Sequence, residues 1–267
     1  MPQFGKAGDT FLIEEGLVGE EFSLFALCDG QHYKIVGWAQ DHKTVFDGDH
    51  GPNTGGVGSV APAGVVDKDV LAEVETKILT PTMAGMQKEG RPFTGIVYLG
   101  AMLTKNGVKV IEFNARFGDP EAEVIVPGIQ TDYISIVEAV MRGSLNTLTV
   151  EKDDKVRLSV AGCSRGYPTD YSAVKGKEIF GLTEAMKLPG IIIYGAGISK
   201  LASKEVKREG NRFFANGGRV FHLVAEGENI IQARVRAYGA MAMISIEGNN
   251  LHYRTDIGWR DVERLMQ

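Results

Sequence analysis

Two side chains with oxygen ligands, Glu112 and Asn114, stand two residues apart in the stretch VKVIEFNARFGDPEAE, residues 108–123. Side chains alternate between the two faces of a strand, so this pair faces one side if the stretch is extended. Mg²⁺ prefers oxygen ligands, takes few of them from carboxylates and completes its shell with water and phosphate. The spacing therefore predicts a divalent-metal site beside a phosphate group.

Residues that could bind an anion follow this pair. Arg116 falls on the same face if the strand continues, and a guanidinium suits phosphate or carboxylate groups. Gly118, Asp119 and Pro120 then predict a turn. An edge strand with solvated polar side chains is the alternative, but the density of charged residues beside an apolar strand favours a functional role.

A long glycine-rich loop, QDHKTVFDGDHGPNTGGVGSVAP, covers residues 40–62 and has no apolar periodicity. Loops of this length in compact domains are usually functional or disordered, and this backbone could present N–H groups to an anion. The spacing of a Walker loop is absent. His42 and His50 lack the spacing of a zinc site, and we expect them to form hydrogen bonds within the loop. Lys43 could add a positive charge, and Asn53 and Thr54 could form hydrogen bonds with hydroxyl groups.

Acidic residues also cluster near the start of the chain, where Glu14, Glu15 and Glu21 flank a short connection at residues 16–19. A solvated turn is one interpretation of this cluster. The other is a nucleoside pocket, in which carboxylates accept hydrogen bonds from ribose hydroxyls.

Apolar periodicity predicts an α+β fold that opens with antiparallel sheet. Strands are expected at residues 11–13, 21–27 and 32–39, with a hairpin turn at Asp29-Gly30 between the last two. A helix is expected over residues 67–79.

A second hairpin and a helix follow. The hairpin has arms at residues 93–103 and 108–114, so the predicted metal pair lies on its second arm. Thr131 is the expected N-cap of a helix that Gly143 ends. The expected buried side of this helix consists of Tyr133, Ile134, Val137, Val140 and Met141.

The polar segment at residues 144–154 predicts a boundary between a first domain, 1–150, and a smaller α+β domain, 151–267. In the second domain Arg219, beside a glycine turn, is the candidate functional residue. The expected elements there are strands at 156–163, 191–194 and 220–225, a hairpin turn at 216–219, and a helix over 228–243 that buries Ile231, Val235 and Tyr238.

The bulk properties exclude several classes of protein. A formal net charge of -5 over 267 residues argues against a general nucleic-acid-binding surface. The sequence has no run of eighteen apolar residues and a polar start, so we expect neither a transmembrane helix nor a secretory signal. Cys28 and Cys163 lie far apart on apolar segments, as expected for buried free thiols in a reducing cytoplasm.

Five segments together resemble the phosphoribosylamine–glycine ligase family, ATP-grasp enzymes of purine biosynthesis. These are IEEGLVGEEFS, the loop at residues 40–62, VIEFNARFGDPE, NGGRV and the closing DIGWR, and the resemblance covers essentially the whole chain. It implies the C-terminal half of an ATP-grasp catalytic domain, an antiparallel sheet with helices, followed by a small α+β domain.

The resemblance also implies roles for residues. Glu112 and Asn114 stand where the family binds Mg²⁺ or Mn²⁺, and Arg116 and Asp119 stand close to the acyl-phosphate site. The implied nucleotide-binding residues are Glu14, Glu15 and Leu17 at the hinge and Glu21 near the ribose. The implied residues that face the amine and amino-acid substrates are Lys43, Asn53, Thr54, Gly55 and Gly56.

The implied reaction joins glycine to 5-phosphoribosylamine while ATP becomes ADP and phosphate, with glycyl phosphate between the two steps. Family members begin with an α/β domain and a lid-like subdomain that have no counterpart here. We therefore expect a portion of a longer enzyme that is inactive alone. The alternatives are another ATP-grasp carboxylate–amine ligase and a non-catalytic nucleotide-binding module.

Overall fold

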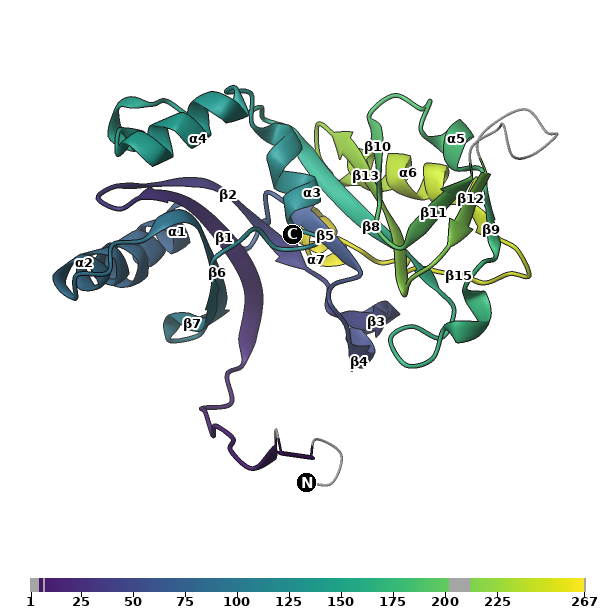
Figure 1. Cartoon of the computed structure of the whole chain (residues 1–267), viewed down its shortest axis with the longest axis horizontal. Helices are drawn as coiled ribbons and strands as arrows, with labels where there is room; N and C mark the ends of the chain where they lie inside the picture. Colours follow the sequence, from purple (N-terminus) through teal and green to yellow (C-terminus); the bar gives the residue numbers. More distant parts are fainter. Residues whose placement is uncertain (1–4, 7, 202–211, 267) are drawn as a thin grey trace.

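The computed structural model describes residues 5–6, 8–201 and 212–266, which form the α+β fold that the sequence predicts (Figure 1). The strands are β1 (Gly19–Asp29), β2 (Tyr33–Asp41), β3 (Thr44–Phe46), β4 (His50–Asn53), β5 (Gly58–Ala61), β6 (Thr94–Thr104), β7 (Gly107–Asn114), β8 (Val156–Ser164), β9 (Glu178–Phe180), β10 (Ile191–Gly195), β11 (Ile198–Leu201), β12 (Arg212–Ala215), β13 (Arg219–Gly227), β14 (Ser245–Ile246) and β15 (Leu251–His252).

The helices and helical turns are α1 (Lys68–Val74), the π-helical turn η3 (Glu75–Leu79), α2 (Thr80–Lys88), α3 (Ala122–Ile125), α4 (Tyr133–Arg142), α5 (Leu182–Ala185), α6 (Ile230–Met241), α7 (Trp259–Met266) and the 3₁₀ turns η2 (Asp47–Asp49), η4 (Val126–Gly128), η5 (Leu145–Thr147) and η6 (Ser172–Val174). Asp67 begins α1 by accepting hydrogen bonds from two backbone N–H groups. None of the helices among the described residues is both long and apolar enough to cross a bilayer.

One antiparallel sheet crosses the whole molecule in the order β10-β13-β8-β5-β2-β1-β6-β7, and β15 adds to β8. β5 pairs with β8, so the sheet continues across the boundary predicted near residue 150. The division into 1–150 and 151–267 remains a prediction. A smaller sheet has the order β11-β12-β9-β14, and β3 and β4 form a two-stranded ribbon.

Alternation along β1 creates the first core. Phe22, Leu24 and Ala26 are buried on the face that packs with Val70 and Val74 of α1. Because the period of a strand is two residues, Glu21, Ser23, Phe25 and Leu27 fall on the opposite face.

α3 and α4 cover part of that opposite face. Phe25 and Leu27 pack there with Val124 of α3 and Ile136 of α4. The polar residues nearer the start of β1 therefore lie beyond these contacts, on a face that is apolar at one end and polar at the other.

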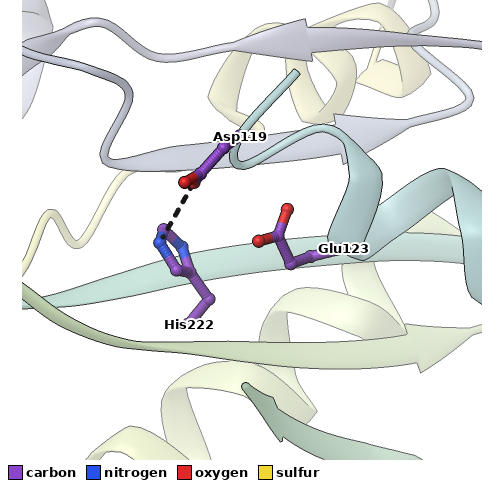
Figure 2. Close-up of side chains that lie close together, drawn as sticks. All are labelled: Asp119, Glu123 and His222. Atoms are coloured by element: carbon purple, nitrogen blue, oxygen red, sulfur yellow. Dashed lines mark ion pairs between the residues drawn. The ribbon is translucent and has the colours of Figure 1, made fainter. Parts of the chain in front are cut away.

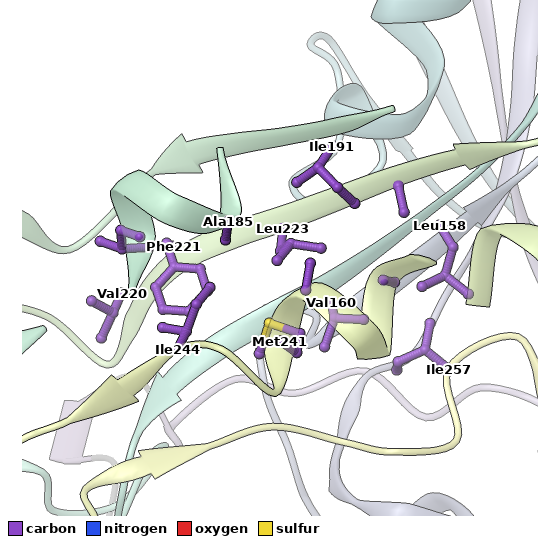
Figure 3. Packing of buried hydrophobic residues seen from close by; sticks show 14 of the residues in the cluster. Leu158, Val160, Ala185, Ile191, Val220, Phe221, Leu223, Met241, Ile244 and Ile257 are labelled. Carbon is purple, nitrogen blue, oxygen red and sulfur yellow. The ribbon is translucent and has the colours of Figure 1, made fainter. Parts of the chain in front are cut away.

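A second core lies between β8, β13 and α6 (Figure 3). The residues of α6 that bury are Ile230, Ala233, Ala237, Ala240 and Met241. The predicted burial of Ile231 and Val235 is therefore wrong, since they are 47% and 69% exposed. Small alanine side chains let α6 approach β8 and β13 closely, and this packing decides which face turns inward.

α4 differs from its prediction in the same way. Asp132, not Thr131, is the N-cap, and its carboxylate accepts a hydrogen bond of 2.8 Å from the Ser135 N–H. Gly143 ends the helix at φ 67, as predicted. Val140 is buried, as predicted, and so is Ile136, which was not part of the predicted buried side. The other four residues of the predicted buried side are exposed: Tyr133, Ile134, Val137 and Met141.

Three local predictions are wrong. The loop at residues 40–62 contains β3, β4 and β5, whose polar and glycine-rich sequences hide their pairing with neighbouring strands. Residues 216–219 do not form a hairpin, because β12 and β13 belong to different sheets. Residues 11–13 form no strand, and the chain before β1 runs away from the sheet (Figure 1).

The two cysteines are buried and free, as predicted. Burial raises the pKa of the Cys28 thiol and of the Cys163 thiol to about 12. Both thiols therefore stay protonated at neutral pH and behave as small apolar core groups.

The packing of α6 gives the first testable prediction. Ala237→Leu should lower the free energy of unfolding by about 1–3 kcal/mol, because it places extra volume in a filled core. Val235→Ala should change it by less than about 0.5 kcal/mol, because Val235 is mostly exposed. Urea denaturation of both variants checks the prediction, and the reverse ranking would contradict this helix orientation.

Asp29 gives a second prediction. Burial alone would raise its pKa, but hydrogen bonds from the backbone N–H groups of His32, Gln31 and Leu145 lower it to about 2. The resulting stabilisation, about 1–2 kcal/mol, is present above pH 4 and is lost as the pH falls towards 2. Asp29→Asn should remove this acid dependence in denaturation measured from pH 2 to 7. The exposed control Asp154→Asn should retain it.

Candidate functional site

The β6–β7 hairpin positions the predicted metal pair. Glu112 stands opposite Gly100 and Asn114 opposite Tyr98, and the register is regular between them, so the two side chains share one face. A Cβ on Gly100 would stand 3.1 Å from the Glu112 Cγ, so the glycine leaves room for the Glu112 side chain. The geometry is as predicted, and the metal-binding role remains a prediction.

Lys43 lines a small pocket. Three carboxylates line the same pocket, those of Glu21, Asp41 and Glu112. Its ammonium lies 2.6 Å from the Glu21 Oε2. Burial would lower the pKa of Lys43, but this hydrogen bond and the charges of Glu21, Asp41 and Glu112 raise it. Lys43 is therefore a fixed cation in an acidic pocket.

Asp41 is the least satisfied group of this pocket. Its Oδ1 is buried and has no hydrogen-bond partner among the described residues, and burial together with the charge of Glu121 raises its pKa well above the usual value. Nearby, the Ser23 hydroxyl donates to Glu121 Oε1 at 2.9 Å and lies 2.8 Å from the Tyr98 hydroxyl. The pocket thus offers one unsatisfied oxygen, Asp41 Oδ1, beside the carboxylates of Glu21 and Glu112, and hard oxygen ligands of this kind fit a divalent cation such as Mg²⁺.

Arg219 joins the glycine-rich loop to the turn after β7. Its Nη1 donates to the carbonyl oxygens of Gly55, Gly56 and Asp119 at 2.9, 3.1 and 3.0 Å. Its Nη2 donates to the Asp119 carboxylate at 3.0 Å. The glycine-rich loop, the turn after β7 and the start of β13 lie far apart in the sequence, and they meet at this guanidinium.

Gly56 and Thr54 shape the loop at this junction. Gly56 has φ 101, and a Cβ there would stand 2.4 Å from Pro120 Cδ and 2.6 Å from Asp41 Oδ1. The Thr54 hydroxyl donates to the Lys43 carbonyl at 2.7 Å and accepts from the Gly56 N–H at 3.0 Å. Thr54 thus stabilises the loop, in addition to any substrate contact.

Other predicted residues lie apart from this junction. Glu14 and Glu15 are exposed and Leu17 is half-buried, in the extended chain before β1. Asn53 is exposed at the end of β4. The strand does not continue to Arg116, because β7 ends at Asn114, so the condition for Arg116 to share the face of Glu112 and Asn114 is not met. The Arg116 guanidinium donates to the Phe117 carbonyl at 2.8 Å.

Sequence reasoning missed three neighbours of this junction, Asp41, Glu123 and His222. His222 lies on β13, fully buried, with its Nε2 3.5 Å from Asp119 Oδ1 (Figure 2). Burial lowers the pKa of His222 to about 4, and burial followed by the charge of Asp119 raises the pKa of Glu123 to about 7. A histidine inside the apolar run VFHLVA was the available signal for this position.

Two domain models of one family match the chain in order. The model described as "Phosphoribosylglycinamide synthetase, ATP-grasp (A) domain" matches residues 1–122, and "Phosphoribosylglycinamide synthetase, C domain" matches residues 157–260. The chain belongs to the phosphoribosylglycinamide synthetase family. This confirms the resemblance seen in the sequence, together with an ATP-grasp region followed by a smaller domain.

Similarity to individual proteins supports the assignment to this family. A phosphoribosylamine–glycine ligase of Caldanaerobacter subterraneus is 44% identical over 95% of this chain and 57% of that protein. The trifunctional purine biosynthetic protein adenosine-3 of Bos taurus is 44% identical over 99% of this chain and 25% of that protein. The crystal structure of a phosphoribosylamine–glycine ligase from Thermotoga maritima is 34% identical, with a TM-score of 0.74, over 91% of this chain and 56% of that chain. The chain thus spans little more than half the length of these two ligases.

The contacts of Gly56 give a third prediction. Gly56→Ala should lower the free energy of unfolding by about 2 kcal/mol, because its φ is positive and its Cβ position is already occupied. Gly55→Ala should cost less than about 1 kcal/mol, because the atom nearest to its Cβ position, the Arg219 Nη2 at 3.3 Å, has to shift only slightly. Urea denaturation compares the two, and equal effects would contradict the close approach at Gly56.

Proposed function

We propose that this chain carries the metal- and substrate-binding part of an ATP-dependent ligase that joins glycine to 5-phosphoribosylamine. The products are glycinamide ribonucleotide, ADP and phosphate. The observation that carries the proposal is the ordered match of both phosphoribosylglycinamide synthetase domains. The meeting of the glycine-rich loop, the β7 turn and Arg219 at one site supports it.

Glu112 and Asn114 would hold Mg²⁺, or Mn²⁺ in its place. The metal would neutralise charge on the phosphates of ATP, as phosphoryl transfer requires. Lys43 adds a positive charge to the same pocket. No nucleophilic side chain is needed, because the glycine carboxylate itself attacks the γ-phosphate.

Glycyl phosphate then reacts with the amine of phosphoribosylamine, and phosphate leaves. Arg116 and Asp119 would lie near this acyl phosphate. The nucleotide would meet Glu14, Glu15, Leu17 and Glu21, and the other substrates would meet Lys43, Asn53, Thr54, Gly55 and Gly56. We place the protein in the cytoplasm, where its two buried thiols would stay reduced.

Binding and reconstitution test this function. Calorimetry of the chain with glycinamide ribonucleotide and with Mg²⁺·ATP measures each site directly. The chain should then be joined to the part of the Caldanaerobacter subterraneus ligase that it does not match. We expect ADP release that requires both glycine and phosphoribosylamine. Turnover with a different amino acid or amine would indicate another carboxylate–amine ligase, and ligand binding without turnover a non-catalytic module.

Glu112→Gln gives the fourth prediction. In the same fusion it should weaken Mg²⁺-dependent nucleotide binding by at least about tenfold, because an amide is a poorer ligand than a carboxylate. The fold should persist, since Glu112 is exposed. Titration of Mg²⁺ at fixed ATP checks this, with the exposed Glu89→Gln as control. An unchanged Mg²⁺ dependence would exclude Glu112 as a ligand.

A further inference from the structure

His222 is a buried histidine whose nearest charged neighbour is the Asp119 carboxylate, 3.5 Å from its Nε2. Alternation on β13 sends Phe221 and Leu223 into the core beneath α6 and His222 to the opposite face. His222 is 1% exposed, and neither ring nitrogen has a hydrogen-bond partner among the residues that the structure describes. Buried polar groups without partners are costly and rare, so this ring is expected to bind something else.

Two carboxylates face the same space as this ring. Asp119 comes from the turn after β7 and Glu123 from α3, and Figure 2 shows both directed towards His222. One ligand atom of each residue lies within 4.8 Å of those of the other two. The Glu123 Oε2 is also buried and lacks a partner among the described residues.

One imidazole and two carboxylates are ligands suited to a borderline transition metal. Zn²⁺ binds histidine nitrogen and carboxylate oxygen at about 2.0–2.2 Å, which places the ligands of a tetrahedral ion about 3.4 Å apart. Closing the cluster therefore needs movements of roughly one ångström. The Asp119 side chain is half-exposed, which leaves room for this movement if the paired Arg219 guanidinium moves with it. Mg²⁺ favours all-oxygen sites and would prefer the Glu112 face.

We propose that Asp119, Glu123 and His222 form a Zn²⁺ site distinct from the magnesium pair Glu112 and Asn114. Three protein ligands leave a fourth position for water or an anion. Arg219 pairs with the Asp119 carboxylate and partly offsets its charge, which favours an anion at that fourth position. A bound ion would link the β7 turn to β13.

The test is metal binding by the purified chain. Metal analysis after dialysis, calorimetry with Zn²⁺ and visible absorption with Co²⁺ should each report one ion per chain, in excess Mg²⁺ that saturates oxygen-only sites. His222→Asn and Glu123→Gln should each weaken Zn²⁺ binding by roughly 100-fold or more, since even outer-shell changes cost 10–100-fold. The exposed His50→Asn is the matched control and should leave binding unchanged.

Two results would overturn the proposal. One is failure of the wild-type chain to retain a stoichiometric ion; the other is unchanged affinity in Glu123→Gln. Circular dichroism shows whether the His222→Asn variant has folded. If it has not, the Zn²⁺ affinity of Glu123→Gln decides between the two outcomes, because this change keeps the volume of the side chain. No ATP, glycine or phosphoribosylamine enters the experiment, so its outcome is independent of the ligase function.

Discussion

The Arg219 guanidinium is the contact on which the candidate site depends. It comes from β13, yet its hydrogen bonds go to the glycine-rich loop and to the turn after β7. A planar group with five donors can satisfy several carbonyls and a carboxylate at once, whereas a lysine could not do so in a fixed geometry. One side chain of the C domain thus sets the shape of a site that the ATP-grasp region largely builds.

The continuous sheet makes this arrangement possible. β5 pairs with both β2 and β8, so the two matched domains share one hydrogen-bonded framework. Its faces are divided between apolar residues under the helices and a polar stretch near the start of β1. The acidic pocket around Lys43 lies on that polar stretch, where opposite charges keep the ammonium ionised despite partial burial.

Sequence patterns predicted local features well. The hairpin that carries Glu112 and Asn114, the left-handed Gly143 and the two buried thiols all follow from neighbouring residues. Helix faces were less predictable: Val235 and Ile134 turn outward, because the neighbouring sheet, not apolar spacing, selects the buried side. The strands inside the glycine-rich loop were missed because their order comes from pairing with distant segments.

The sequence by itself determined the family, the α+β class and the spacing of the oxygen ligands, since each depends on residues close together in the chain. Tertiary structure decided that Arg219 meets Asp119, and that His222 faces Asp119 and Glu123 across a separation of about one hundred residues. When two residues are this far apart in the sequence, the sequence pattern does not show that they are in contact. They arise from the register of β13 against β8 and from the packing of α3, which only the folded sheet fixes.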